Sequence, residues 1–164
     1  MTTTASPAQL IPAATTDGTT GLCLAIVGSR DFPDLRRVLR FVHGLPAGIV
    51  VATGGARGVD RCAAAAARAR GLEVTEHLAD WDRHGTRAGF IRNRTVALRC
   101  DRMVAFWDTF SSGTADAITC ALRRGRPVTV VLPRSAGSRP VVLTNRLAAP
   151  PVSSVLYVRR HVVR

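Results

Sequence analysis

The hydrophobic positions of this chain form short runs that alternate with amphipathic stretches. The runs are four to six residues long, which suits buried strands, and between them apolar residues recur at helical spacing. Strands are predicted at residues 22–27, 49–52, 72–75, 102–106 and 128–132. Helices are predicted at residues 34–44, 59–70, 86–99 and 115–124. The intervening polar residues 80–85 are expected to form a loop.

Regular alternation of strands and helices predicts an α/β fold with a mainly parallel sheet. Parallel strands need crossover connections, and the crossover helices cover both faces of the sheet. We therefore expect a Rossmann-like three-layer α/β/α architecture with at least five strands. Ligands of such sheets bind in the crevice at the carboxyl ends of the strands, so the loops that follow the strands are the first place to look for function.

The 164 residues are enough for one ordinary domain, which we place at residues 21–132. Residues 1–20 are rich in Thr and Ala and show no sustained period, so a disordered tail is expected there. Residues 133–164 form a basic C-terminal extension with six arginines and no acid. Its apolar run at 155–158 is compatible with an added edge strand or with a tail that a partner orders.

Composition narrows the function classes. The net charge is +12, and all 23 basic residues are arginine, which weakly favours an anionic partner and also fits a GC-rich genome. No apolar run is long enough to span a bilayer and no secretory signal is evident, so a cytoplasmic protein without a membrane partner is expected. The four cysteines are scattered singly, which signals neither a metal site nor a disulfide framework, and no cofactor is predicted.

A glycine-rich turn follows the second predicted strand and carries the strongest local signal. Gly54, Gly55 and Gly58 allow close backbone approach, and the amides of the helix that starts beside them attract an anion. Arg57 would add a guanidinium, and Asp60 lies in the first helical turn. The alternative is a tight connection without a ligand. The string lacks the lysine of a P-loop and is not a G-x-G-x-x-G fingerprint, so hydrolysis of the P-loop type is not expected.

Two further turns are expected at the same edge of the sheet. Ser112-Gly113-Thr114 opens the last predicted helix, where backbone amides and hydroxyls suit a phosphate or a ribose, although an ordinary helix cap explains the pattern equally well. Gly28-Ser29-Arg30 follows the first strand. Because all three turns follow parallel strands, they are predicted to meet in one crevice.

The segment between the third and fourth strands adds an aromatic ring and polar side chains to this edge. Trp81 could stack on a base, Arg92 could pair with a phosphate, and Asn93 is a candidate ligand contact. Taken singly, a tryptophan is more often a packing residue and a helical arginine a solvated one.

The motifs in their order along the chain resemble the YspA-like, YpsA-related SLOG family over roughly residues 22–132. The resemblance lies in the following segments: Val27–Asp31, Gly54–Asp60, Ala79–Trp81, Ala88–Gly89, Ile91–Arg94, Ala105–Asp108 and Ser112–Thr114. It implies a Rossmann-like fold and a pocket for nucleotides or nucleotide-derived signals. It also implies wider kinship with the LOG phosphoribohydrolases and the DNA-processing protein A group, and a homo-oligomer, because related proteins assemble.

Comparison with the LOG enzymes does not decide whether this chain catalyses their reaction. Those enzymes use an arginine and the glutamate of a P-G-G-x-G-T-x-x-E motif. Here Arg92 resembles the arginine, but Ala117 stands in the glutamate position and Asp116 lies one residue earlier. Asp116 is a catalytic candidate. One residue turns a helical side chain by about 100 degrees, so its carboxylate is expected to point away from the glutamate position of the motif.

Three functions therefore remain open. The first is a sensor or carrier of a nucleotide-like ligand, with phosphate on the glycine turns, base near Trp81 and ribose near Asp60 or Asp116. The second is hydrolysis of the N-glycosidic bond of a nucleoside monophosphate by Arg92 and Asp116. The third is binding of single-stranded nucleic acid, which the net charge and the basic C-terminal extension motivate.

Overall fold

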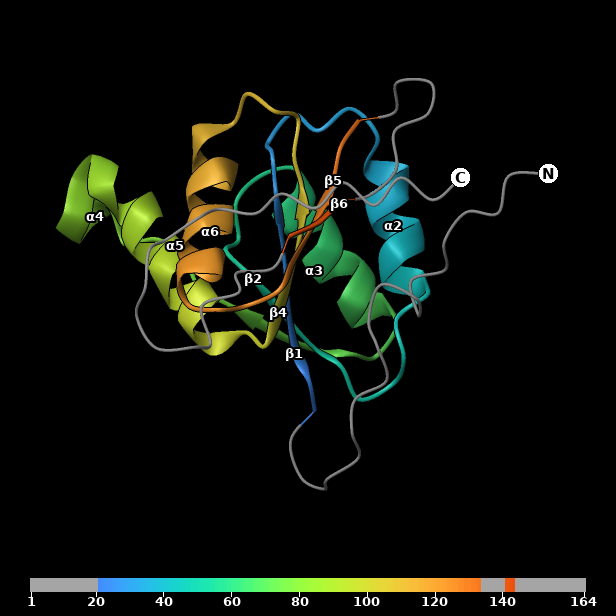
Figure 1. The fold of residues 1–164 in the computed structure, drawn as a ribbon. Coiled ribbons are helices and arrows are strands. Elements are labelled where there is room, and N and C mark those ends of the chain that lie inside the picture. Colours follow the sequence, from blue (N-terminus) through green and yellow to red (C-terminus); the bar gives the residue numbers. More distant parts are fainter. Residues whose placement is uncertain (1–20, 134–140, 144–164) are drawn as a thin grey trace, which may run out of the picture.

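The computed structural model describes residues 21–133 and 141–143, and it shows strands and helices in alternation (Figure 1). The strands are β1 (Cys23–Gly28), β2 (Val50–Thr53), β3 (Glu73–Glu76), β4 (Arg102–Phe106), β5 (Val128–Val131) and β6 (Val141–Leu143). The helices are α2 (Leu35–His43), α3 (Val59–Ala69), α4 (Trp81–His84), α5 (Ala88–Arg99), α6 (Ser112–Arg123) and the 3-10 turn η1 (Gly85–Arg87).

The six strands form one sheet in the order β3-β2-β1-β4-β5-β6. The first five are parallel, and β6 pairs with β5 antiparallel, with Val130 opposite Val141. The chain moves outward from β1 to β3 and then returns to the other side of β1 as β4, so the strand order reverses between β1 and β4. This arrangement confirms the predicted Rossmann-like fold with a mainly parallel sheet of at least five strands.

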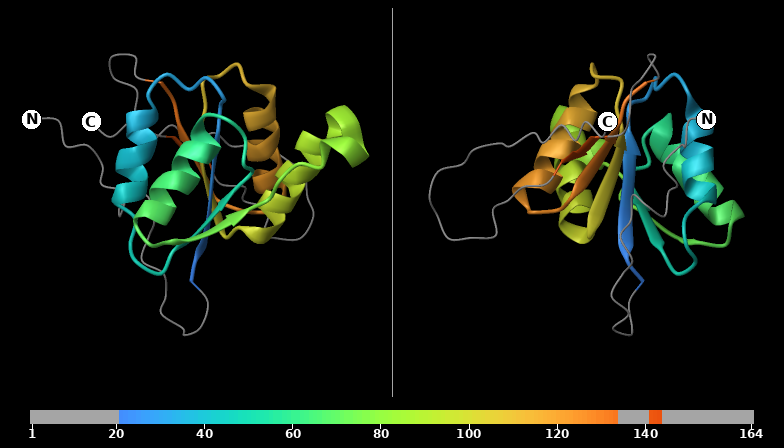
Figure 2. Two further views of the ribbon diagram at one scale, coloured as in Figure 1. Left: turned by 180° about the vertical axis from the view of Figure 1, so that it is seen from behind. Right: turned by 45° about the vertical axis from the view of Figure 1, so that its right-hand side comes forward.

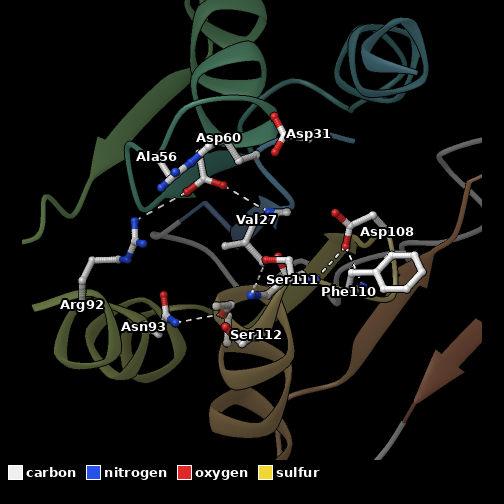
Figure 3. Close-up of a pocket in the computed structure, with 15 residues that line it drawn as sticks. Val27, Asp31, Ala56, Asp60, Arg92, Asn93, Asp108, Phe110, Ser111 and Ser112 are labelled. Atoms are coloured by element: carbon white, nitrogen blue, oxygen red, sulfur yellow. Dashed lines mark hydrogen bonds and ion pairs between the residues drawn. The ribbon is translucent and has the colours of Figure 1, made fainter. Parts of the chain in front are cut away.

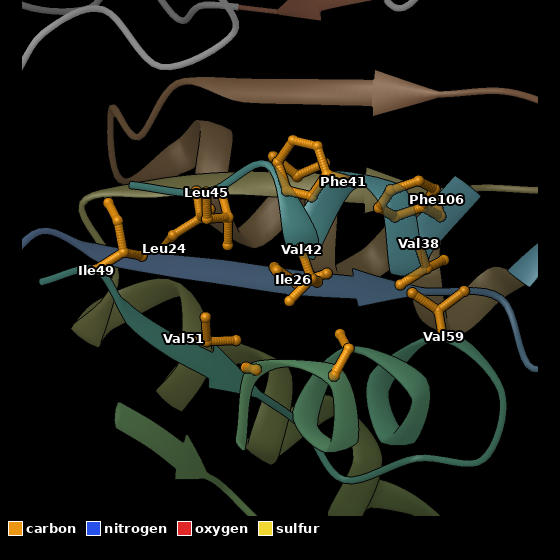
Figure 4. Packing of buried hydrophobic residues seen from close by; sticks show 14 of the residues in the cluster. Leu24, Ile26, Val38, Phe41, Val42, Leu45, Ile49, Val51, Val59 and Phe106 are labelled. Carbon is orange, nitrogen blue, oxygen red and sulfur yellow. The ribbon is translucent and has the colours of Figure 1, made fainter. Parts of the chain in front are cut away.

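Helices cover both faces of the sheet (Figure 2). Successive residues of β1 point to opposite faces, so Leu24 and Ile26 pack under α2 and α3, whereas Ala25 and Val27 pack under α5 and α6. Each face has its own buried cluster. On the α2–α3 side, the ring of Phe106 meets two other phenylalanine rings edge to face, at centroid distances of 5.6 Å and 5.9 Å, and Figure 4 shows it among its aliphatic neighbours.

Most predicted elements are observed within one or two residues of their expected ends, with two differences. The segment 80–85, expected as a loop, contains the short helix α4, because the carboxylate of Asp80 accepts a hydrogen bond from the backbone N–H of Arg83 at 3.0 Å. Helix α6 begins at Ser112 rather than at residue 115, because Ser111 caps it.

Several expectations concern residues outside the described ones. The tail at 1–20 and the apolar run at 155–158 are among them. Within the C-terminal extension, the structure describes the edge strand β6. In the described part of the chain, no helix is both long and apolar enough to cross a membrane, and no three acidic, histidine or cysteine side chains are grouped to hold a metal ion.

Candidate functional site

A cleft of about 480 Å³ opens where the strand order reverses, at the carboxyl ends of β1 and β4. Its position is the one that open α/β sheets use for ligands, and its volume lies within the range of small-molecule sites. Figure 3 shows the residues around it. They are Val27, Gly28, Arg30, Asp31, Ala56, Asp60, Arg92, Asn93, Asp108, Phe110, Ser111, Ser112, Gly113, Thr114 and Ala117.

The N-terminus of α6 forms one wall of this cleft. The Ser111 hydroxyl accepts hydrogen bonds from the backbone N–H of Thr114 at 3.3 Å and from its hydroxyl at 3.0 Å. The amides of Ser112 and Gly113 belong to the first turn, where no intrahelical acceptor exists, and both residues are exposed. A Cβ added to Gly113 would meet no atom within 4 Å among the described residues, so its surface is open. This wall therefore presents free N–H donors at the positive end of a helix dipole.

Asp60 forms the opposite wall, and its carboxylate is almost fully buried at 3% exposure. It accepts hydrogen bonds from the amides of Gly28 at 3.1 Å and Gly54 at 2.9 Å, and the amide of Ala56 also points to it. The guanidinium of Arg92 lies 3.8 Å away and also donates to the Gly54 carbonyl. One carboxylate thus ties together the loops after β1 and β2 and the helix α5.

Burial raises the pKa of Asp60 to about 6. The positive charge of Arg92 and the three amides act in the opposite direction, but burial has the largest effect. The amides of the glycine-rich turn therefore already serve an acidic group of the protein itself, one that takes up a proton near pH 6.

Gly58 shows what the glycines of that turn contribute. Its φ of +82° lies in the left-handed region, and a Cβ would overlap the backbone of Arg30 in the loop after β1. Its role in the described structure is close contact between two loops. Gly54, Gly55, Arg57 and Gly58 are not among the residues that line the cleft.

Ser29 lies beneath the cleft and is fully buried. Its hydroxyl accepts from the backbone N–H of Asp108 at 3.1 Å and lies 3.4 Å from the hydroxyl of Thr114. It therefore holds the loops after β1 and β4 together and does not face the cleft directly, whereas the neighbouring Gly28 and Arg30 do.

Asn93 and Asp116 connect α5 to α6. The Asn93 side-chain amide donates to the Asp116 carboxylate at 2.9 Å and to the carbonyl of Gly113 at 3.0 Å. Asn93 lines the cleft, but Asp116 does not. Arg92 lines it with a guanidinium that already meets Asp60 and Gly54. The two residues expected to act together in catalysis thus have separate partners.

Trp81 lies on α4, is 58% exposed, and is not among the residues that line the cleft. The aromatic residue that does line it is Phe110, which the sequence analysis did not single out.

Asp31 and Asp108 line the cleft as well, and the sequence analysis also missed both of them. Asp108 accepts from the amides of Phe110 at 2.9 Å and Ser111 at 2.8 Å. Burial favours a higher pKa for Asp108, but these amides outweigh it and hold the pKa below its ordinary value. An aspartate three residues before the serine that caps the helix is the signal that could have revealed this turn.

The fold and the cleft define a Rossmann-like α/β protein with a ligand-sized opening at the reversal point of its sheet. A family model, described as YAcAr: YspA, cpYpsA-related SLOG family, matches residues 23–84. The chain belongs to this SLOG family, which confirms the resemblance found in its motifs.

Known proteins resemble this chain in sequence or in structure. The Gene 61 protein of Mycobacterium phage D29 is 39% identical over 113 residues, which cover 63% of this chain and 90% of the phage protein. DNA processing protein A from Streptococcus pneumoniae has a similar structure, with a TM-score of 0.61 and 21% identity over 70% of this chain. The chain spans about half, 51%, of that protein. DNA processing protein A from Helicobacter pylori, which binds single-stranded DNA, has a TM-score of 0.56 and 20% identity, over 71% of this chain and 67% of its own. These two likenesses support the fold.

Proposed function

We propose that the cleft binds a nucleotide or a nucleotide-derived ligand, with a phosphate at the N-terminus of α6, and that the protein acts as a sensor or carrier. The observation that carries this proposal is the pair of unmet amides of Ser112 and Gly113 on the wall of the cleft. Free N–H groups and the helix dipole together favour a phosphate. Membership of the SLOG family supports the same class of ligand.

The distribution of charge in the cleft favours α6 over the glycine-rich turn as the phosphate site. The amides of Gly54 and Ala56 are occupied by the Asp60 carboxylate, which would repel a second anion. Asp31 and Asp60 instead offer acceptors for hydroxyl groups, such as those of a ribose. Arg30, exposed at the cleft, offers a positive charge to the phosphate.

Cleavage of an N-glycosidic bond by Arg92 and Asp116 draws less support from the geometry. The Asp116 carboxylate bonds to Asn93, outside the set of residues that line the cleft, and cannot flank a ligand there without turning. Incubation with nucleoside monophosphates distinguishes the two ideas. Release of free base that Asp116→Asn abolishes would favour the enzyme, and binding without release would favour the sensor or carrier.

Charge reversal at Gly113 tests the proposed phosphate site. Gly113→Asp places a carboxylate in the first turn of α6, where the helix dipole favours it and open space receives it, so the fold should be preserved. We expect at least about a tenfold loss of affinity for nucleoside 5′-monophosphates in calorimetric titration, because like charges repel in a shared site.

The matched control is Thr119→Asp, which adds the same charge to an exposed position of α6 outside the cleft and should bind as the wild type does. Ligand binding should also raise the melting temperature of the wild type and of the control. Equal affinity of Gly113→Asp and wild type would contradict the proposed phosphate site.

A second candidate function is binding of single-stranded DNA, which one surface favours. Trp81 and Phe90 are exposed on α4 and α5 beside the exposed arginines Arg87 and Arg94, and α4 projects from the body of the domain (Figure 1). Exposed rings beside arginines suit bases and phosphates of a strand. Affinity for an oligo(dT) strand that falls with salt, and that replacement of Arg87 and Arg94 lowers, would support this candidate. Salt-independent binding would count against it.

A further inference from the structure

Phe110 is the most exposed large hydrophobic side chain of the described residues, at 90% exposure, and it lies on the rim of the cleft. Among the described residues that line the cleft, it is also the one aromatic residue. In Figure 3 it lies beside Asp108, at the end of the cleft away from Arg92. An aromatic ring that no neighbour covers leaves both faces available for a planar partner.

The loop that carries this ring is held by several hydrogen bonds. Asp108 accepts from the amides of Phe110 and Ser111, and its own amide donates to the buried Ser29 hydroxyl at 3.1 Å. The Trp107 indole N–H donates to the Ser111 carbonyl at 3.1 Å. The backbone on both sides of Phe110 is therefore fixed to the core.

The loop also adopts a conformation that its sequence disfavours. Thr109 has a φ of +75°, and a β-branched residue is a true outlier in the left-handed region. Strain of this kind persists only where the surrounding structure enforces it. Here the enforced conformation holds Phe110 out at the rim, next to the first turn of α6.

We infer that Phe110 stacks on the base of the ligand, so that the cleft recognises a base and its phosphate as one unit. The inference rests on the proposed function and deepens it. Phe110 precedes Ser112 by two residues, so the ring and the proposed phosphate site are neighbours. Val27, Ala56 and Ala117 are the aliphatic residues lining the cleft, and none has a flat face for a base. Either a free nucleotide or a nucleotide within a single strand provides this unit.

Substitution of Phe110 separates recognition of the base from recognition of the phosphate. The probes are the four common nucleoside 5′-monophosphates, ribose 5-phosphate and a single-stranded oligo(dT), titrated calorimetrically into the full chain. We expect Phe110→Ala to weaken binding of probes that carry a base by about 5- to 150-fold, the range of one base–aromatic stack. Affinity for ribose 5-phosphate should not change, and Phe110→Tyr should restore the affinity for the base.

Trp81→Ala is the matched control, because it also removes an exposed aromatic ring, but one outside the cleft. It should bind the mononucleotides as the wild type does. Gly113→Asp should lose ribose 5-phosphate and nucleotides together, which distinguishes a failed phosphate site from a failed stacking site.

Each outcome has a defined meaning. A loss for the probes that carry a base, with ribose 5-phosphate unchanged, supports stacking. If the mononucleotides bind and show this loss, a free nucleotide provides the base; if only oligo(dT) binds and shows it, a single strand does. Unchanged binding of every probe by Phe110→Ala overturns the inference while the proposed function stands. An equal loss of ribose 5-phosphate also overturns it, since that result means that the ring only supports the loop. If no probe binds the wild type, the proposed function and the inference both fail.

Discussion

At the scale of single residues, Asp60 explains much of the site. Its buried carboxylate accepts from the amides of Gly28 and Gly54 and faces Arg92, so one side chain links the carboxyl ends of β1 and β2. Because those amides already donate to Asp60, they are not available to bind a ligand. A residue that resembles a ligand contact in the sequence is thus also a structural link.

The raised pKa of Asp60 predicts a pH dependence of stability. The native protein binds a proton at Asp60 more tightly than the unfolded chain does, since its pKa is about 6 against an ordinary value of 3.8. Its contribution to the free energy of unfolding is therefore largest below about pH 3.8 and is lost as the pH rises through about 6, by up to about 3 kcal/mol.

Urea unfolding of wild type and Asp60→Asn between pH 4 and pH 7.5 measures this effect. The stability advantage of the wild type over the variant should shrink as the pH rises. Asp82→Asn, at an exposed position of α4, should follow the wild-type profile. An advantage that grew with pH would mean that the ion pair with Arg92 outweighs burial.

The sequence located several residues that line the cleft but missed others, for identifiable reasons. Gly113 could be found because it opens a helix after a strand, and Arg92 and Asn93 because their side chains suit a phosphate or a hydrogen-bonding ligand. Phe110 could not, because an apolar residue in a polar turn gives no indication of whether it is buried. The direction of Asp116 depends on the rotation of α6, which packing against α5 determines.

At the scale of elements, the turn between β4 and α6 shows how side chains set a helix boundary. Ser111 and Asp108 supply acceptors for amides that would otherwise be unmet, so the helix starts earlier than hydrophobic spacing predicts. The same acceptors hold Thr109 at a positive φ. The hydrogen bonds of Ser111 and Asp108 therefore both cap the helix and keep Thr109 in its strained conformation.

Replacing the strained residue Thr109 with glycine tests whether this turn stores backbone strain. Thr109→Gly should raise the free energy of unfolding by about 1 kcal/mol, because a strained residue costs about 1–3 kcal/mol and the added flexibility of glycine offsets part of the gain. Chemical denaturation measures the change. Thr119→Gly, inside α6, should lower stability by up to about 1 kcal/mol. A destabilised Thr109→Gly would show that the threonine makes compensating contacts.

At the scale of the whole molecule, the alternation of elements was enough to predict the layers but not the strand order. Helices on both faces follow from parallel pairing, whereas the reversal at β1 and the antiparallel β6 depend on contacts between distant segments. The position of the cleft follows from that reversal. The sequence therefore indicated the edge of the sheet at which the cleft lies, but it did not indicate which residues form the walls of the cleft.

The net charge of +12 gives a prediction at this scale for the second candidate function. If α4 and α5 bind single-stranded DNA, log affinity should fall linearly with log salt, and replacing Arg87 and Arg94 with alanine should reduce the slope by roughly 1.4. Fluorescence anisotropy of a labelled oligo(dT) measures it. Replacing Arg36 and Arg61, exposed on the helices of the opposite face, should leave the slope unchanged. Equal slopes in all three proteins would exclude this surface as the binding site.

The ion pair between Arg92 and Asp60 also crosses from one helical layer to the other. Asp60 belongs to α3 on one face of the sheet, and Arg92 belongs to α5 on the opposite face, so their contact passes around the end of the strands. The layers cannot slide apart at this end without separating a charged pair that is largely shielded from water. A molecule that enters the cleft therefore meets a side that both helical layers hold in place, opposite the hydrogen-bonded loop that carries Phe110.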